Sequence, residues 1–154
     1  MNIIIKEATL DDVSIVRELI YELALYEHLE KYCTLTDDKL TELMNENSIY
    51  SLIAYTEDNI PIGFLSYYFF KITTFSGKKV LYVEDIFIKS EYRRLGVGKL
   101  LFDKIKSIAK SKDCERIEWK CLDWNKPSIE FYKSIGGSID SNWLLFTIDK
   151  SKYL

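Results

Sequence analysis

Cysteine, histidine and proline are scarce in this chain of 154 residues, which has three cysteines, one histidine and two prolines. The cysteines, Cys33, Cys114 and Cys121, are odd in number and lack C-x-x-C spacing, so neither a disulfide framework nor a zinc site is indicated. The histidine, His28, lies far from Cys121 in sequence, so a Cys-His acyl-enzyme has little support and we interpret Cys121 as a core residue. The pattern favours a reducing cytoplasm and predicts no metal.

Long apolar runs and an excess of positive charge are also absent. No apolar run approaches the roughly 20 residues that span a bilayer, and residues 1–7 lack the apolar region of a signal peptide. Lysine and arginine number 21 against 24 aspartates and glutamates, and the net charge of −3 argues against general nucleic-acid binding. We therefore expect no membrane partner and no nucleic-acid partner.

The residues that are abundant predict one mixed α/β domain over residues 1–154, because 47% of the chain is apolar and 14% is aromatic. Alternation and β-branched content predict strands at 3–6, 50–55, 60–70, 80–88 and 116–122, and closing strands within 138–148. Apolar residues at helical spacing, together with capping residues, predict helices at 9–26, 36–44, 97–112 and 127–134.

The most informative motif joins the strand 80–88 to the helix 97–112. Here Arg93-x-x-Gly96-x-Gly98 places two glycines at the start of a helix, where backbone N–H groups have no intrahelical partner and attract anions. The spacing is neither that of the dinucleotide fingerprint nor that of a Walker loop. The motif therefore predicts a different kind of phosphate site.

This spacing resembles the R/Q-x-x-G-x-G/A signature of the GCN5-related N-acetyltransferase (GNAT) superfamily. The resemblance implies an acyl-CoA N-acyltransferase fold, with an open twisted mixed sheet of six to seven strands and helices on both faces. It also implies that the strands before and after the glycine loop splay apart to admit acetyl-CoA as co-substrate. The residues implied to bind its pyrophosphate are Arg93, Arg94, Leu95, Gly96, Val97, Gly98 and Lys99.

Within the superfamily the chain resembles the spermidine/spermine and thialysine N-acetyltransferases. Four segments carry this resemblance in the same order along the chain: 22–27, 63–69, 81–93 and 122–132. Members of this group are homodimers that build part of the site across their interface, so the resemblance implies a homodimer. The implied reaction is direct transfer of the acetyl group of acetyl-CoA to a primary amine of a small molecule.

Such a reaction needs a free amine and a proton for the departing thiolate. The resemblance implies that Glu84 removes the amine proton through ordered water, and that Tyr132 is the general acid. Because Glu84 lies within an otherwise apolar strand, we expect its pKa to be raised. The alternatives are that Glu84 only holds the substrate ammonium or caps the splayed sheet, and that Tyr132 only packs on the core.

Further residues are implied to contact the two substrates. The exposed backbone of Ile86, Phe87 and Ile88 is implied to pair with the acetyl and pantetheine groups, and Asn125 and Ser128 to contact the same cofactor. Asn125 is also a candidate cap for the helix that follows it. The residues expected to bind the amine are Tyr26, Glu27, Glu84, Asp85 and Trp143.

The identity of the amine stays open at this stage. Polyamine acetyltransferases of the group carry an acid ahead of a tryptophan before the strand 80–88, whereas Lys71 to Phe75 has neither, which favours a thialysine-like amino acid or short diamine over spermine. Two alternatives remain. One is a protein lysine or N-terminal acetyltransferase, and the other is a non-catalytic module that binds acetyl-CoA.

Overall fold

The computed structural model describes residues 1–70 and 72–154, so Lys71 of the loop discussed above lies outside the described residues. Contacts along the chain divide it into two compact units, residues 1–120 and residues 121–154. The expectation of one domain over 1–154 stays a prediction.

The first unit contains a five-stranded sheet in the order β1-β2-β3-β4-β5. The first four strands are antiparallel neighbours, and β5 pairs with β4 in parallel. The strands are β1 (Ile3–Glu7), β2 (Tyr50–Thr56), β3 (Pro61–Phe70), β4 (Val80–Ile88) and β5 (Arg116–Trp119). The helices of this unit are α1 (Val13–Tyr26), α2 (Asp37–Asn45) and α3 (Val97–Ser111), with short 3-10 turns at 10–12, 30–32 and 90–92.

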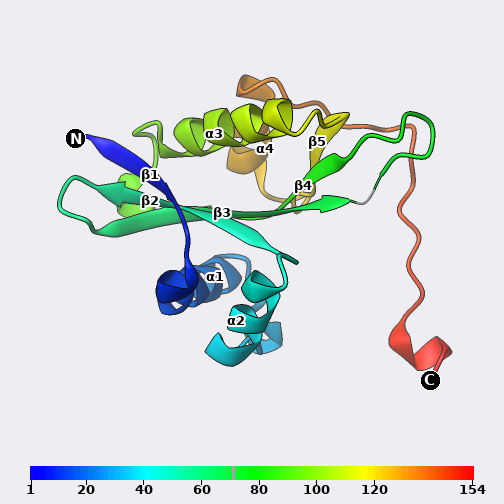
Figure 1. Cartoon of the computed structure of the whole chain (residues 1–154), viewed down its shortest axis with the longest axis horizontal. Helices are drawn as coiled ribbons and strands as arrows, with labels where there is room; N and C mark the ends of the chain where they lie inside the picture. Colours follow the sequence, from blue (N-terminus) through cyan, green and yellow to red (C-terminus); the bar gives the residue numbers. More distant parts are fainter. Residues whose placement is uncertain (71) are drawn as a thin grey trace. The chain divides into compact units, whose positions relative to one another are not determined.

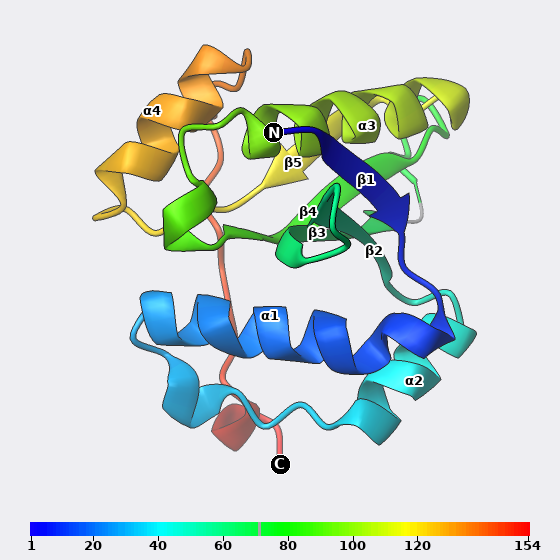
Figure 2. The same cartoon turned by 90° about the vertical axis from the view of Figure 1, so that its left-hand side faces the viewer.

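Helices cover both faces of this sheet, as Figures 1 and 2 show: α1 and α2 lie on one face and α3 lies on the other. The amphipathic pattern of α1 explains its position, because Val16 and Leu19 are buried against sheet residues such as Phe64. The buried residues of α3 are Val97, Leu101, Phe102, Ile105 and Ala109. The mixed α/β fold with helices on both faces is therefore as expected from the sequence.

Local signals set the helix boundaries. A capping box formed by Thr9 and Asp12 precedes α1, and the Thr36 side chain accepts a hydrogen bond from the Lys39 N–H at the start of α2. Both starts lie where the sequence predicts them. No helix among residues 1–70 and 72–154 combines the length and the apolar character needed to cross a bilayer.

Strand β4 contains a bulge that shapes the site. In its register with β3, Tyr67 faces Val83 and Ser66 faces Asp85, so Glu84 is the extra residue between two regular pairs. On the other edge, β4 pairs with β5 only from Val80 to Val83. The parallel pairing therefore stops one residue before Glu84, because β5 ends at Trp119 rather than at the expected residue 122. The expected splaying of the two strands stays a prediction.

The second unit contains α4 (Lys126–Ser134) and a 3-10 turn at Lys150–Lys152. Residues 138–148 are all described and form no strand, so the closing strands predicted there are wrong for this structure, and the described sheet has five strands rather than six or seven. The physical reason is the lack of a pairing strand, since an isolated extended segment gains no ladder hydrogen bonds. Its large apolar side chains are consequently exposed, including Trp143 and Phe146.

Candidate functional site

Three carboxylates converge where α1 ends and β4 bulges. Glu27 caps the C-terminus of α1, and Glu84 and Asp85 follow the last β4–β5 pair. Burial, and then the negative charges of Glu84 and Glu27, raise the pKa of Asp85 to about 7. Burial also raises the pKa of Glu27. Such a cluster favours a positively charged ligand.

The burial expected at Glu84 falls instead on its neighbour. Glu84 is exposed and Asp85 is half-buried, so the burial that the apolar strand pattern predicts at position 84 is found at position 85. The bulge explains the difference, because the extra residue is displaced from the regular alternation of the strand. The sequence pattern treats β4 as a regular strand and does not contain this information.

Two tyrosines stand beside the carboxylates. Tyr68 and Tyr82 face each other across β3 and β4, with ring centroids 5.2 Å apart. Burial raises the pKa of both hydroxyls, that of Tyr82 to about 12, and the charge of Glu84 acts in the same direction on each. A hydrogen bond to Glu84 also contributes at Tyr68. Aromatic faces beside carboxylates suit an ammonium group, and no motif in the sequence marks this pair of tyrosines.

The glycine loop has the geometry of an anion site. Gly96 is the N-cap of α3, its φ of 82° is left-handed, and no side chain caps the helix there. A Cβ built on Gly96 meets no atom within 4 Å, so the space beside the backbone is open. The first N–H groups of a 15-residue helix therefore face an open approach, which fits the pyrophosphate of a coenzyme.

The three cations of the loop differ in their contacts. Arg94 is exposed, and Lys99 forms an ion pair of 2.6 Å with Asp103. Arg93 donates a hydrogen bond of 2.9 Å from Nε to the carbonyl of Ile88, and its guanidinium lies 4.7 Å from the ring centre of Tyr26. Arg93 therefore ties the loop to β4 and α1, and the exposed Arg94 is a candidate to bind a phosphate.

A pocket of about 320 Å³ lies between the last turns of α1 and the end of β4. We call it the α1–β4 pocket. Three of its lining residues, Tyr26, Phe87 and Arg93, were singled out in the sequence, and two others, Glu22 and Lys89, were not. Glu22 and Lys89 form an ion pair of 3.5 Å across the pocket wall. No local sequence signal marks this pair, because it joins a helix to the end of a distant strand.

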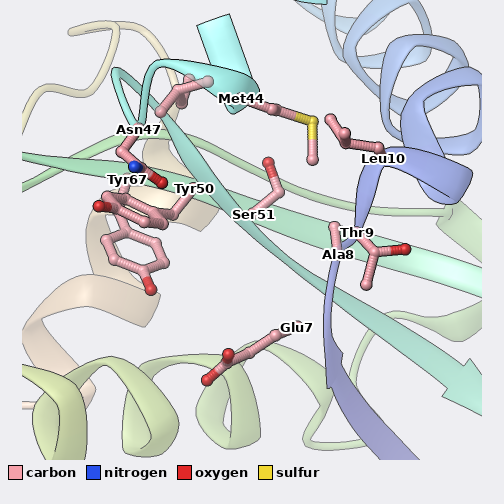
Figure 3. A pocket seen from close by; sticks show the side chains of 10 residues that line it. Glu7, Ala8, Thr9, Leu10, Met44, Asn47, Tyr50, Ser51 and Tyr67 are labelled. Atoms are coloured by element: carbon pink, nitrogen blue, oxygen red, sulfur yellow. The ribbon is translucent and has the colours of Figure 1, made fainter. Parts of the chain in front are cut away.

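A second cavity, of about 170 Å³, contains none of the predicted residues. Figure 3 shows it near the start of β2, with the stacked rings of Tyr50 and Tyr67 on one side and Met44 and Leu10 on the other. The two ring centroids are 5.3 Å apart. Burial raises the pKa of Tyr67 to about 12. Its lining contains one carboxylate, Glu7, and no cation.

Four of the predicted residues belong to the second unit. The Asn125 side chain accepts a hydrogen bond from the Ser128 N–H, which confirms its expected capping role at α4. Tyr132 lies within α4, with its ring centroid 5.5 Å from that of Phe131, and Trp143 is 79% exposed. Their roles toward acetyl-CoA and the amine stay predictions. Cys121, expected in the core, is exposed, and its thiol donates to the carbonyl of Leu122.

Among the described parts of the chain, no cluster of three or more histidine, cysteine or acidic side chains is arranged to hold a metal ion. The site consists of carboxylates, tyrosines and a helix N-terminus. These groups can bind a cation beside a phosphate-bearing ligand.

Relatives with known names align with more than half of this chain. The chain is 28% identical to a thialysine N-epsilon-acetyltransferase of Caenorhabditis elegans over 96% of its own length and 92% of that protein. A shorter match, 36% identical, covers 57% of the chain and 38% of an L-ornithine N5-acetyltransferase of Arabidopsis thaliana.

A solved structure and a protein family also match this chain. The fold matches the crystal structure of an aminoglycoside acetyltransferase from an uncultured soil metagenomic sample in complex with sisomicin, with a TM-score of 0.82 and 20% identity over 96% of this chain and 95% of the other. The Acetyltransferase (GNAT) family matches residues 16–136. With its glycine loop at the start of α3 and a β4 strand that extends beyond its pairing with β5, the chain belongs to the GNAT family of acetyltransferases.

Proposed function

We propose that this chain transfers the acetyl group of acetyl-CoA to the side-chain amine of a small amino acid, with thialysine as the first candidate. Two named relatives support an amino acid, since one is a thialysine and the other an ornithine acetyltransferase. The cluster of Glu27, Glu84 and Asp85 supports a cationic acceptor. A short diamine is the second candidate, and spermidine is a weaker one.

One observation carries the proposal: β4 loses its partner β5 after Val83, and two carboxylates follow immediately. The backbone of Ile86 to Ile88 has β3 on one edge and no β5 pairing on the other. An extended coenzyme arm pairs well with a strand edge of this kind. Its thioester would then lie close to the groups that bind the amine.

In the proposed chemistry, one residue takes a proton from the acceptor amine and another gives a proton to the departing sulfur. The acceptor enters as an ammonium, and Glu84, directly or through water, removes its proton so that the nitrogen lone pair is free. The nitrogen then bonds to the acetyl carbon while the carbon–sulfur bond breaks, and it releases its second proton to water to give the neutral amide. Tyr132 donates its proton to the departing sulfur and is recharged from solvent. Asp85 and Glu27 hold the cation during binding.

We also propose that the chain works as a homodimer. Six large apolar side chains of the second unit are exposed and occur within ten positions: Ile139, Trp143, Leu144, Leu145, Phe146 and Ile148. Apolar residues on both alternating faces of an extended segment are typical of a strand buried on both sides. Light scattering tests this point, with a mass near twice 18.1 kDa expected and a mass of 18.1 kDa contradicting it. The cytoplasmic location stays a prediction.

The function itself is tested by amine-dependent release of free CoA from acetyl-CoA. The panel contains thialysine, lysine, ornithine, a short diamine, spermidine and a lysine-containing peptide. Selective release with a small amine supports the proposal. Release only with the peptide would favour a protein acetyltransferase, and binding of acetyl-CoA without release for any amine would favour a non-catalytic module.

A further inference from the structure

The α1–β4 pocket and the carboxylate cluster form one continuous row of side chains from α1 and β4. Three interactions join α1 to β4 in order along the strand: the charge of Glu27 acts on Asp85, the ring centroids of Tyr26 and Phe87 are 6.5 Å apart, and Glu22 forms an ion pair with Lys89. Asp85 and Phe87 point to the same face because they are two residues apart on a regular part of β4. The row thus changes from acidic, through aromatic, to an end that carries charges of both signs.

The far end of the row contains two cations and two carboxylates. Lys89 and Arg93 lie there together with Glu22 and Glu91. Arg93 uses Nε for its bond to Ile88, and a guanidinium has two further nitrogens with N–H donors. Such a mixture suits a zwitterion, since a carboxylate finds cations and an ammonium finds a carboxylate within one pocket.

We propose that the α1–β4 pocket binds the α-carboxylate and α-ammonium groups of the amino-acid substrate, while the side-chain amine lies at Glu84 and Asp85. This inference rests on the function proposed above and names the part of the chain that separates amino acids from simple diamines. Lys89 and Arg93 receive the carboxylate, and Glu22 receives the α-ammonium. The intervening chain packs against the rings of Tyr26 and Phe87, where a thioether sulfur makes favourable contacts.

The length of the row agrees with the length of such a substrate. Two residues along a strand cover about 7 Å, which is the separation expected between Asp85 and Phe87. In thialysine, as in lysine, five bonds separate the side-chain nitrogen from Cα, or about 6 Å when extended. A side-chain amine at Asp85 therefore places Cα near Phe87, at the entrance to the pocket of about 320 Å³.

The existing ion pair does not block this binding. Glu22 and Lys89 are 3.5 Å apart, with side chains 39% and 26% exposed, so their interaction is weak and exchangeable. A zwitterion offers each of them a new partner of opposite charge. The net charge of the pocket then stays the same on binding, which avoids a desolvation cost for an unpaired ion.

The test compares thialysine with its decarboxylated analogue, bis(2-aminoethyl) sulfide, which keeps the amine and the thioether. We expect kcat/KM to be at least about 10-fold higher for thialysine, and Lys89→Met to reduce this ratio about 10-fold through the KM for thialysine. Lys78→Met is the matched control, because it breaks an ion pair of 3.2 Å between Lys78 and Asp113 at another surface. It is expected to leave the ratio unchanged.

The possible results separate this inference from the function on which it rests. Equal kcat/KM for the two amines, or a ratio that Lys89→Met does not lower, would overturn the inference and leave acetyl transfer standing. Failure to acetylate any amine would overturn the proposed function itself. The variant Glu22→Gln is a second test, because it is expected to raise the KM for thialysine without changing the KM for acetyl-CoA.

Discussion

Asp85 lies directly opposite Ser66 on the neighbouring strand, and Glu84, the residue before it, has no partner in that register. This single irregularity gives two adjacent carboxylates different environments. Asp85 is half-buried beside two other negative charges, whereas Glu84 is exposed at the bulge. In this account, Asp85 therefore helps to hold the cation, and Glu84 is free to reach the amine proton.

Replacement of Asp85 by asparagine should change the pH dependence of stability. The pKa of Asp85 rises from 3.8 to about 7 on folding, so between these pH values the unfolded chain has released a proton that the folded chain keeps. The free energy of unfolding should therefore fall as the pH rises through this interval. Asp85→Asn removes that fall and should raise stability at pH 8 relative to pH 5 by roughly 1 to 2 kcal/mol, less than the full shift implies because water screens a half-buried group.

Urea unfolding at pH 5 and pH 8 measures this effect. Asp103→Asn is the control, since Asp103 is exposed and pairs with Lys99 on the surface of α3. A wild-type protein whose stability is the same at both pH values would contradict the assigned burial of Asp85.

Replacement of Glu84 by glutamine should slow acetyl transfer by about 10- to 100-fold, because glutamine accepts no proton from the ammonium. The loss should be largest at low pH, where less of the amine is already free. The pH profile of kcat/KM for the two proteins measures it. If both profiles have the same shape and the loss lies in KM alone, Glu84 is a binding residue.

Replacement of Gly96 by valine should weaken acetyl-CoA binding at least about 10-fold. The side chain would enter the open space beside the first N–H groups of α3 and would also adopt an unfavourable positive φ. Gly77→Val is the matched control, because Gly77 has a φ of 72° and equally open surroundings in a different loop. Both variants should lose about 1 to 2 kcal/mol of stability.

Only the Gly96 variant should also lose affinity for the coenzyme, measured by calorimetry at a temperature at which both variants are folded. Equal affinity in the two variants would remove the glycine loop from the account of coenzyme binding.

Replacement of Tyr132 by phenylalanine should lower turnover by about 100-fold while the dissociation constant for acetyl-CoA stays within about twofold, since only the proton donor is lost. Single-turnover release of CoA and equilibrium binding measure the two quantities. Tyr21→Phe, on the exposed side of α1, serves as the control. Undiminished turnover would show that another group protonates the sulfur.

Much of the secondary structure of the first unit can be predicted from local sequence signals. The starts of α1 and α2 lie at Thr9 and Thr36 because threonine side chains cap helices regardless of the rest of the fold. The glycine loop is similarly local, since one left-handed residue at Gly96 turns the chain into α3. The sheet strands are recognisable because their apolar residues are buried on both faces.

The features that the sequence did not predict depend on distant partners. Residues 138–148 have the composition of strands and form none, because a strand needs a second chain segment to pair with. The bulge at Glu84 arises from the register of two strands, and the ion pair of Glu22 with Lys89 joins a helix to a strand end. Neither the bulge nor the ion pair can be predicted from the local pattern of residues.

The most direct test of the central claim is amine-dependent release of CoA from acetyl-CoA by the wild-type chain, with thialysine as acceptor and Tyr132→Phe as control. The account predicts release that requires the amine, saturates with it and falls strongly in the variant. A chain that binds acetyl-CoA but releases no CoA with thialysine, other amino acids or diamines would contradict it.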